Sequence, residues 1–191
     1  MSIGKAASPS MREQNVDRTK QAILQAAQSL FATRGYAEAG VRDIAALATV
    51  NPALIARYYG SKLELFEAAL ESLLDVTMFT TVDRTRFGDQ LAAAFFATRA
   101  DAASVIPMLV FAASDSQARM AVLRLLGRHV VVPLEAWFGG ADAAERTAQL
   151  IAVITGFYTY RLMLPLSPLE GEPTVSMRQW LARTLQEIVD R

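Results

Sequence analysis

Apolar residues recur at intervals of three and four positions along most of this chain, the spacing that places them on one face of a helix. In the first such segment they are Ile23, Ala26, Ala27, Leu30 and Phe31. This pattern predicts a helix over residues 17–34. Gly35 follows directly and is expected to end the helix, because glycine readily takes the left-handed conformation that stops one.

Two short helices are predicted next, over 41–48 and 52–58, with a turn of three residues between them. Asn51 is suited to cap the second helix, since its side chain can accept a hydrogen bond from an otherwise unpaired backbone N–H. Pro52 stands at the first helical position, where the N–H that proline lacks would have no partner in any case.

The remaining pattern is also helical. Ser61 and Glu64 form a capping box, which predicts a long connecting helix over 61–79. Further helices are predicted over 88–99, 101–113, 116–137, 142–164 and 174–190.

Signals for strands are nearly absent, so the predicted fold class is all-α. Pro107 and Pro133 are expected to kink the helices that contain them. The segment 165–173 is the longest clear loop, and Thr174 is expected to cap the last helix.

Composition excludes several classes of site. The chain has 191 residues, of which 52% are hydrophobic, with one histidine and no cysteine. A disulfide scaffold, a thiolate metal site and a histidine-rich zinc centre are therefore excluded, and we expect neither a metal nor a cofactor. A small helical enzyme is an alternative from another class. It has no support, because the chain offers no nucleophile–base pair, no metal-ligand spacing and no glycine-rich phosphate loop.

Run length argues against a membrane protein. The longest stretch without a charge is the 14 residues between Arg146 and Arg161, whereas a spanning helix needs about 20. The first 15 residues have no apolar segment of the kind found in signal peptides. We expect a cytoplasmic protein.

The formal net charge of zero hides an uneven distribution. Residues 1–66 carry a net charge of +3, and the remainder carries −3. The neutral total is therefore no argument against nucleic-acid binding by the N-terminal part.

Two short helices joined by a tight turn and supported by a longer helix form the geometry of a helix-turn-helix, which places its second helix in the major groove of DNA. Ala45 and Ala48 are small, as a close crossing of the two helices requires. Plain packing of two helices without a role in DNA binding is the alternative that this pattern alone leaves open.

Residues 20–70 strongly resemble the N-terminal domain of TetR-family transcriptional regulators. The motifs that carry the resemblance are Ala22-Ile23-Leu24, Ala26-Ala27, Leu30-Phe31, Arg34-Gly35-Tyr36, Val41-Arg42-Asp43-Ile44-Ala45, Val50-Asn51-Pro52-Ala53-Leu54-Ile55 and Tyr58-Tyr59-Gly60-Ser61-Lys62. The resemblance implies a homodimer that places two recognition helices in adjacent major grooves of a double-stranded operator, most often as a repressor that a small-molecule effector releases.

The resemblance also implies which residues contact DNA: Arg42, Asn51, Pro52, Ala53, Arg57, Tyr58 and Lys62. The chemistry agrees, because arginine can pair with guanine through two hydrogen bonds, while a tyrosine hydroxyl and an ammonium group suit phosphate oxygens. Lys5 and Arg12 in the N-terminal arm could add contacts without sequence preference.

Three positions depart from the family pattern. Gly40 replaces a threonine that caps the first short helix, Thr49 replaces a glycine in the turn, and Ala56 replaces a common tyrosine. These departures leave open a second interpretation, a helical interaction protein whose DNA-binding motif is degenerate.

The predicted domains are a flexible arm over 1–16, a helix-turn-helix domain over 17–62 and an effector-binding and dimerisation domain over 63–191. An apolar or aromatic effector is expected to contact Phe79, Phe95, Phe96, Met108, Phe111, Trp137, Phe157 and Arg161. Arg161 could meet a carboxylate of the effector or, equally, pair with an acid across the dimer. The predicted dimer interface consists of Leu150, Ile154, Tyr158, Trp180, Leu181 and Leu185.

Overall fold

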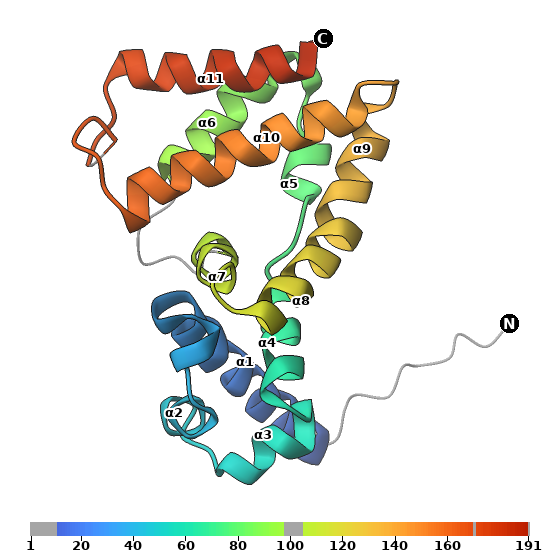
Figure 1. Ribbon diagram of the computed structural model, residues 1–191, viewed down its shortest axis with the longest axis vertical. Coiled ribbons are helices and arrows are strands. Elements are labelled where there is room, and N and C mark those ends of the chain that lie inside the picture. The colour runs from blue at the N-terminus through green and yellow to red at the C-terminus, as the bar shows by residue number, and fades with distance from the viewer. Residues whose placement is uncertain (1–10, 98–104, 170, 191) are drawn as a thin grey trace, which may run out of the picture.

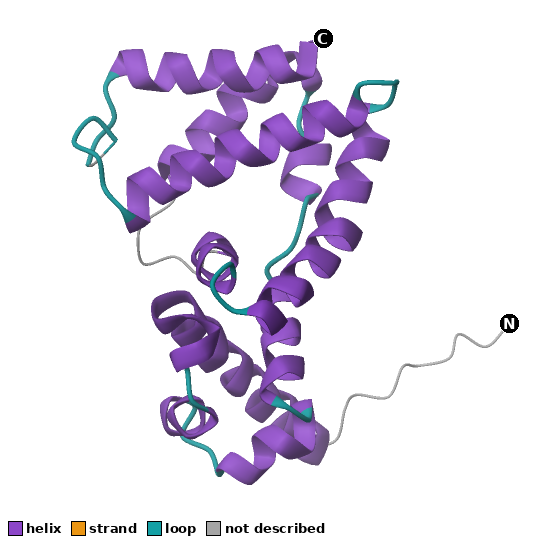
Figure 2. Ribbon diagram, in the orientation of Figure 1, coloured by secondary structure: helices purple, strands orange, loops and turns teal. Residues whose placement is uncertain are grey.

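A computed structural model describes residues 11–97, 105–169 and 171–190. Within these ranges the chain forms helices and loops and no strand, which confirms the predicted all-α class (Figures 1 and 2). The α-helices are α1 (Met11–Glu38), α2 (Val41–Leu47), α3 (Pro52–Tyr59), α4 (Lys62–Glu71), α5 (Thr77–Thr80), α6 (Phe87–Ala97), α7 (Val105–Ala112), α8 (Ser116–Leu126), α9 (Val132–Phe138), α10 (Ala143–Tyr158) and α11 (Val175–Asp190).

The first helix starts earlier than its apolar pattern predicted. Helix α1 begins at Met11, so the flexible arm predicted over 1–16 is wrong for residues 11–16, and residues 1–10 lie outside the described chain. The polar residues from Arg12 to Gln14 favour helix although they carry no apolar pattern. Gly35 interrupts α1 as predicted, with φ of 74°.

The long connecting helix predicted over 61–79 is also wrong, because α4 ends at Glu71. The Ser72 hydroxyl donates to the carbonyl oxygen of Ala69 at 2.9 Å, a local bond of the kind that competes with helix propagation. Asp75 then accepts a hydrogen bond from the backbone N–H of Thr77 at 2.8 Å, which starts the separate short helix α5.

Neither expected proline kink is decided by the structure. Pro107 lies in α7, but residues 98–104, which overlap two predicted helices, lie outside the described chain, so the kink at Pro107 stays a prediction. Pro133 lies at the start of α9, and a π-helical segment, Gly127–Val131, joins α8 to α9 just before it. A second π-helical segment, Thr159–Met163, extends α10.

Buried side chains form two separate cores. The first core joins α1 to α4 with α7 and α8, and the second joins α6 with α9, α10 and α11. In the second core α6 crosses α11 at Gly88, where a Cβ atom would lie 2.0 Å from the carbonyl oxygen of Ala182. The cores therefore divide the chain differently from the predicted boundary between residues 62 and 63, because α7 and α8 complete the core of the N-terminal helices.

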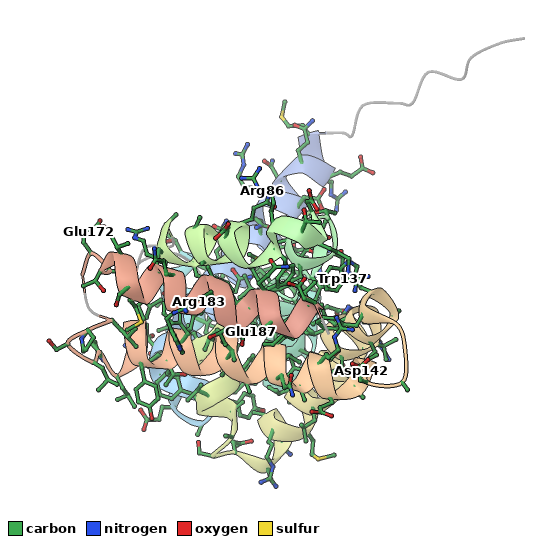
Figure 3. All side chains as sticks on the ribbon, turned by 90° about the horizontal axis from the view of Figure 1, so that it is seen from above. Arg86, Trp137, Asp142, Glu172, Arg183 and Glu187 are labelled. Atoms are coloured by element: carbon green, nitrogen blue, oxygen red, sulfur yellow. The ribbon has the colours of Figure 1, made fainter. Side chains whose placement is uncertain are left out.

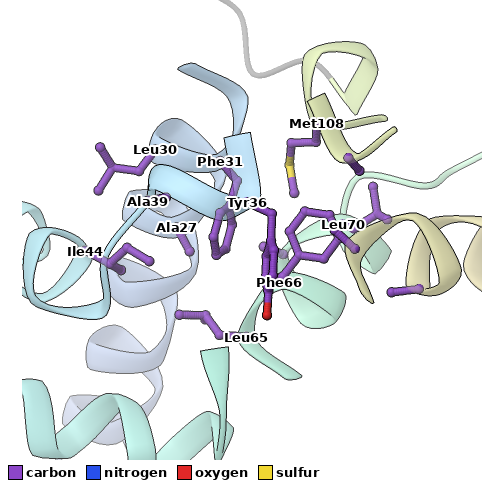
Figure 4. Packing of buried hydrophobic residues seen from close by; sticks show 14 of the residues in the cluster. Ala27, Leu30, Phe31, Tyr36, Ala39, Ile44, Leu65, Phe66, Leu70 and Met108 are labelled. Atoms are coloured by element: carbon purple, nitrogen blue, oxygen red, sulfur yellow. The ribbon is translucent and has the colours of Figure 1, made fainter. Parts of the chain in front are cut away.

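Aromatic rings form the centre of the first core. The Phe66 ring lies edge-on to Phe31 at 5.2 Å and to Tyr36 at 5.3 Å between ring centroids. Figure 4 shows Met108, from α7, beside this cluster. Such ring pairs contribute about 0.5–1.5 kcal/mol each beyond the area that they bury. The cluster thus fixes α4 and α7 against α1.

We therefore predict that Met108→Ala loosens the N-terminal helices, although Met108 lies in the sequence region assigned to the effector domain. Met108 is 1% exposed, and removing such a side chain costs about 2–5 kcal/mol in the free energy of unfolding. Denaturant unfolding measures the loss, and hydrogen exchange should show it at the amides of α1 and α4. Met120→Ala is the matched control, since Met120 is 63% exposed on α8. Faster exchange confined to α6 and α9–α11 would contradict the prediction.

Candidate DNA-binding interface

Helices α2 and α3 pack through small and apolar side chains, as the sequence predicted. Ile44, Ala45 and Ile55 are buried between them and α1. The turn is closed by backbone hydrogen bonds from Thr49 to Ala46 at 3.1 Å and from Val50 to Ala45 at 2.9 Å. The geometry is that of a helix-turn-helix, with the outer face of α3 left uncovered.

The start of α3 is capped as predicted. The Asn51 side chain accepts a hydrogen bond from the backbone N–H of Ala53 at 2.9 Å, and Pro52 occupies the first helical position. Asn51, Pro52, Ala53 and Arg57 are all exposed. Helix α3 lies at the opposite end of the molecule from α10 and α11, where nothing described in the chain covers its outer face (Figure 1). These four predicted DNA contacts are therefore brought together on one accessible surface.

Helix α2 presents Arg42 to solvent in its first turn. Gly40, the residue before the first residue of α2, has no side chain and therefore cannot cap the helix. The neighbouring Asp43 lies 3.6 Å from Arg34 of α1 and both side chains are exposed, so this ion pair contributes little to stability. Arg42 is thus accessible at the start of α2.

Tyr58 and Lys62 lie at the other end of α3. The Tyr58 ring is half-buried, with Lys20 at 5.7 Å and Arg57 at 6.0 Å from its centroid. Lys62 is tied inside the chain, since its ammonium donates to the carbonyl oxygen of Ala37 at 3.2 Å. Burial lowers the pKa of Lys62, an effect that the nearby carboxylate of Asp115 opposes. Of the seven predicted contacts, Tyr58 and Lys62 are the two that are partly buried.

Tyr59 is half-buried and is bonded to α1. Its hydroxyl donates to the backbone carbonyl of Lys20 at 2.8 Å, and burial raises the pKa of the phenol. This bond fixes the C-terminal end of α3 to α1. Sequence reasoning missed the contact, because a hydrogen bond between side chain and backbone across 39 positions has no signal in the pattern.

The predicted effector residues do not gather at one place. Phe95, Phe96 and Phe157 pack together in the second core, with the Phe96 and Phe157 centroids 5.2 Å apart. Phe79 and Trp137 pack against the same core, and Trp137 lies 5.4 Å from Phe87. In contrast, Met108 belongs to the first core, and Phe111 covers Gly35 of α1.

Arg161 has an internal role in this structure. Its guanidinium donates to the carbonyl oxygens of Leu169 at 2.8 Å and Gly171 at 3.2 Å, which fastens the loop before α11. The same group lies 5.3 Å from the centre of the Phe96 ring. Its Nε atom is buried without a hydrogen-bond partner.

Four of the six predicted dimer residues are buried within the single chain. Leu150, Leu181 and Leu185 are 0% exposed and Ile154 is 9% exposed in the single chain, because the apolar stripes of α10 and α11 face their own core. Tyr158 is half-buried against Phe95 at 5.2 Å. Trp180 alone remains substantially accessible, at 45%.

Among the residues that the structure describes, no group of histidine, cysteine, aspartate or glutamate side chains is arranged to hold a metal ion. Over the same residues, no helix has both the length and the apolar character that crossing a bilayer would require.

Comparison with known proteins identifies the family. A family model described as the tetracyclin repressor-like C-terminal domain matches residues 85–189, more than half of the chain. The chain belongs to the TetR family. A second model, described as bacterial regulatory proteins of the tetR family, matches residues 23–69 and confirms the resemblance of the N-terminal motifs. TetR-family proteins are transcription regulators and not enzymes.

Curated relatives named as HTH-type repressors match over short stretches. The HTH-type transcriptional repressor Rv3405c of Mycobacterium tuberculosis is 52% identical over 52 residues, which are 27% of this chain and 28% of that protein. The HTH-type transcriptional repressor NicS of Pseudomonas putida is 38% identical over 63 residues, 33% of this chain and 30% of its own. The match thus spans less than a third of either relative.

Solved structures extend the likeness to the whole TetR fold. A TetR-family transcriptional regulator from a Rhodococcus species has a TM-score of 0.70 at 17% identity, and the match covers 91% of this chain and 100% of that one. GusR of Salmonella enterica has a TM-score of 0.68 at 19% identity and covers 91% of this chain and 96% of its own. At these identities the comparison supports the fold alone.

Thr49 adopts a conformation that suits glycine. Its φ of 57° lies in the left-handed region, and it is the one non-glycine residue with positive φ among those described. That conformation costs roughly 1–2 kcal/mol for a residue with a Cβ atom, and a β-branched side chain is especially disfavoured there.

We predict that Thr49→Gly raises the free energy of unfolding by about 1 kcal/mol, since relief of this strain exceeds the entropy that glycine loses on folding. Thermal and urea unfolding measure the gain. Thr33→Gly is the control, because Thr33 lies in the helical part of α1 and should lose a few tenths of a kcal/mol. Equal losses for both variants would show that the turn is unstrained.

Proposed function

We propose that this chain is a homodimeric transcriptional repressor that binds a DNA operator through α2 and α3 and is released by an apolar or aromatic small molecule. The observation that carries the proposal is the accessible outer face of α3, which is capped by Asn51 and carries Arg57 at the end of the molecule. We expect it to act in the cytoplasm. A genomic binding-site selection at moderate salt tests it directly, and absence of any sequence preference would refute it.

The exposed residues divide into base contacts and backbone contacts. Arg42 and Arg57 have the planar donor set that pairs with O6 and N7 of guanine, whereas Pro52 and Ala53 suit contact with a thymine methyl group. Tyr58 is proposed to bind a phosphate. Lys62 could reach a phosphate only by leaving the carbonyl of Ala37, so we expect a smaller contribution from it.

We predict that Arg57→Ala weakens operator binding by about 1–3 kcal/mol per half-site, because one guanine contact is lost in each. Fluorescence anisotropy at fixed salt measures the change, and analytical ultracentrifugation should show an unchanged dimer. Arg128→Ala is the control of equal charge, since Arg128 is exposed in the π-helical segment distant in sequence from α3. Unchanged binding by both variants would show that Arg57 makes no base contact, whereas absence of operator binding by the wild type would favour the alternative, an interaction protein with a degenerate DNA-binding motif.

The dimer is proposed to form through the outer faces of α10 and α11. These helices lie side by side across the end of the molecule opposite α3 (Figures 1 and 3). The outer positions of α10 carry small residues at helical spacing: Ala144, Ala148, Ala152 and Thr155. Small residues allow a partner helix to approach closely. On α11, Trp180 supplies exposed aromatic surface, of the kind enriched in interfaces.

Charges on α11 also suit a two-fold axis. Arg183 and Glu187 are exposed one helical turn apart (Figure 3). In an interface that uses the same surface twice, a positive group on one copy can face a negative group on the other, and the pair then forms twice. This arrangement replaces the buried leucines that the sequence pattern suggested.

We expect Ala152→Arg to convert the dimer to a monomer, because a long charged side chain would be buried at the helix crossing. Sedimentation velocity measures the mass, and operator binding should fall with it since one half-site binds weakly. Ala136→Arg, at an exposed position of α9, is the control and should remain dimeric. A dimer of Ala152→Arg as stable as the wild type would place the interface elsewhere.

The effector is proposed to bind among the aromatic side chains of the second core. Phe95, Phe96 and Phe157 are 3–9% exposed and pack on one another, so a ligand must separate them. Binding would therefore favour a conformation with a more open core and shift the population of dimers away from the one that fits DNA. An effector of this kind should dissociate the protein–operator complex and raise the melting temperature of the free protein.

A further inference from the structure

We infer that the side-chain amine of Lys62 is a site of acylation by an acyl phosphate, and that this modification lowers the affinity of the chain for DNA. The effect on DNA rests on the proposed function, whereas the reactivity of the amine depends only on what surrounds Lys62. Those surroundings are the C-terminal end of α1 and the first turns of α4 and α8.

Lysine is rare among the basic residues of this chain. Lysine and arginine together number 19, and the lysines are Lys5, Lys20 and Lys62. A lysine, unlike an arginine, can give up its proton where its surroundings disfavour the charge, and the uncharged amine is a nucleophile. Because Lys5 lies outside the described residues, Lys20 and Lys62 are the amines that the structure allows us to compare.

The amine of Lys62 is held at a defined place. Its Nζ atom lies 4.6 Å from the centre of the Tyr36 ring and donates to the carbonyl oxygen of Ala37 at 3.2 Å. Tyr36 is 8% exposed and belongs to the first core, whereas Lys62 is partly exposed. The amine therefore lies at the edge of the core, where a small reagent in solution can reach it.

Two features of this place favour the uncharged amine. Burial lowers the pKa of Lys62, because an ammonium group loses part of its hydration there. Lys62 is also the first residue of α4, and the unpaired N–H groups at a helix N-terminus carry partial positive charge that disfavours a cation. The carboxylate of Asp115 acts in the opposite direction and favours the charged amine.

Other titratable groups nearby have partners or are uncharged. Tyr36 is uncharged at neutral pH, since burial raises the pKa of its phenol. On α4, Glu64 accepts a hydrogen bond from the backbone of the helix cap at 2.7 Å, and Glu67 forms an ion pair with an arginine of α8. Asp115 is thus the acid whose charge acts on Lys62, so a change at Asp115 should change the reactivity of the amine.

The acylation step needs no reactant beyond the acyl phosphate. The uncharged Nζ atom attacks the carbonyl carbon, an N–C bond forms, and the C–O bond to the phosphate breaks. Inorganic phosphate leaves with the electron pair of that bond, and the nitrogen releases one proton to solvent. The product is an amide, which has lost the positive charge and the cation–π contact with Tyr36. Its remaining N–H can still donate to the carbonyl of Ala37.

The charge is lost next to the recognition helix. Helix α3 ends at Tyr59 and α4 begins at Lys62. A positive charge at this position attracts the DNA backbone whether or not it touches a phosphate, because such attraction extends over about 10 Å at ordinary salt. Acylation of Lys62 should therefore weaken DNA binding and leave the fold intact.

The first test measures where the chain is acylated. The full-length protein is treated with acetyl phosphate at neutral pH, and peptide mass spectrometry gives the rate at each lysine. We expect Lys62 to react several times faster than Lys20, although Lys20 is the more exposed of the two. Equal or slower reaction at Lys62 would overturn the inference.

Asp115→Asn tests the cause of the reactivity. Asparagine caps a helix as well as aspartate does but carries no charge, so α8 should keep its cap and unfolding curves should stay unchanged. Lys62 should then react faster, while the rate at Lys20 stays the same. p-Nitrophenyl acetate, an uncharged acyl donor, should show the same increase, which separates an effect on the amine from repulsion of the phosphate. No increase with either reagent would contradict the inference.

The second test measures the effect on DNA. Operator binding is compared before and after treatment with acetyl phosphate, for the wild type and for Lys62→Arg, which keeps a positive charge but offers no amine at this position. Treatment should weaken wild-type binding by up to about fivefold per half-site near 0.15 M salt. The affinity of Lys62→Arg should stay at its own untreated value, whatever happens at the other lysines.

Equal changes in the two treated proteins, or no change in the treated wild type, would overturn the inference while the helix-turn-helix proposal stands. A wild type that binds no operator before treatment would instead overturn the proposed function and with it the effect on DNA. The acylation rates at Lys62 and Lys20 would still decide whether Lys62 is the reactive amine.

Discussion

The packing of Phe66 against Phe31 and Tyr36 is the contact on which the arrangement of the N-terminal helices depends. Phe66 stands on α4, while its two ring partners stand on α1. Helices α2 and α3 are attached to this pair through Ile44 and Ile55. The position of α3 is therefore fixed by aromatic packing in the core, on the side of the helix away from its exposed face.

Because α7 and α8 complete this core, the molecule is divided mechanically between α8 and α9 rather than at residue 62. Two contacts attach α4 to the helices that follow it: Glu67 forms an ion pair with Arg124 of α8, and the Glu71 carboxylate lies 2.9 Å from the His129 side chain. A change in the second core can reach α4 through α8 as well as through the short segment after Glu71. Two described connections thus link the aromatic side chains of the second core to α4 and the helices that pack on it.

The sequence predicted well where local chemistry decides. Caps at Asn51 and Ser61 and the small residues of α2 are signals confined to a few neighbouring positions, and each was confirmed, while the stop predicted at Gly35 is a break in the helical backbone within α1. The apolar pattern could show that Leu150 and Leu185 are buried, but not whether they pack against their own chain or against a partner. An apolar stripe on a helix looks the same in both cases. The structure shows that α6 and α9 of the same chain cover these residues.

The π-helical segment between α8 and α9 has a consequence for the phase of that helix. A π turn amounts to one extra residue in an α-helix, and one residue corresponds to a rotation of about 100°. Leu125 before the segment enters the first core, and Leu134 and Phe138 after it enter the second. Gly127–Val131 therefore determines how far the apolar face of α9 is rotated about the helix axis relative to that of α8. A single-residue deletion within the segment would turn the apolar face of α9 towards water.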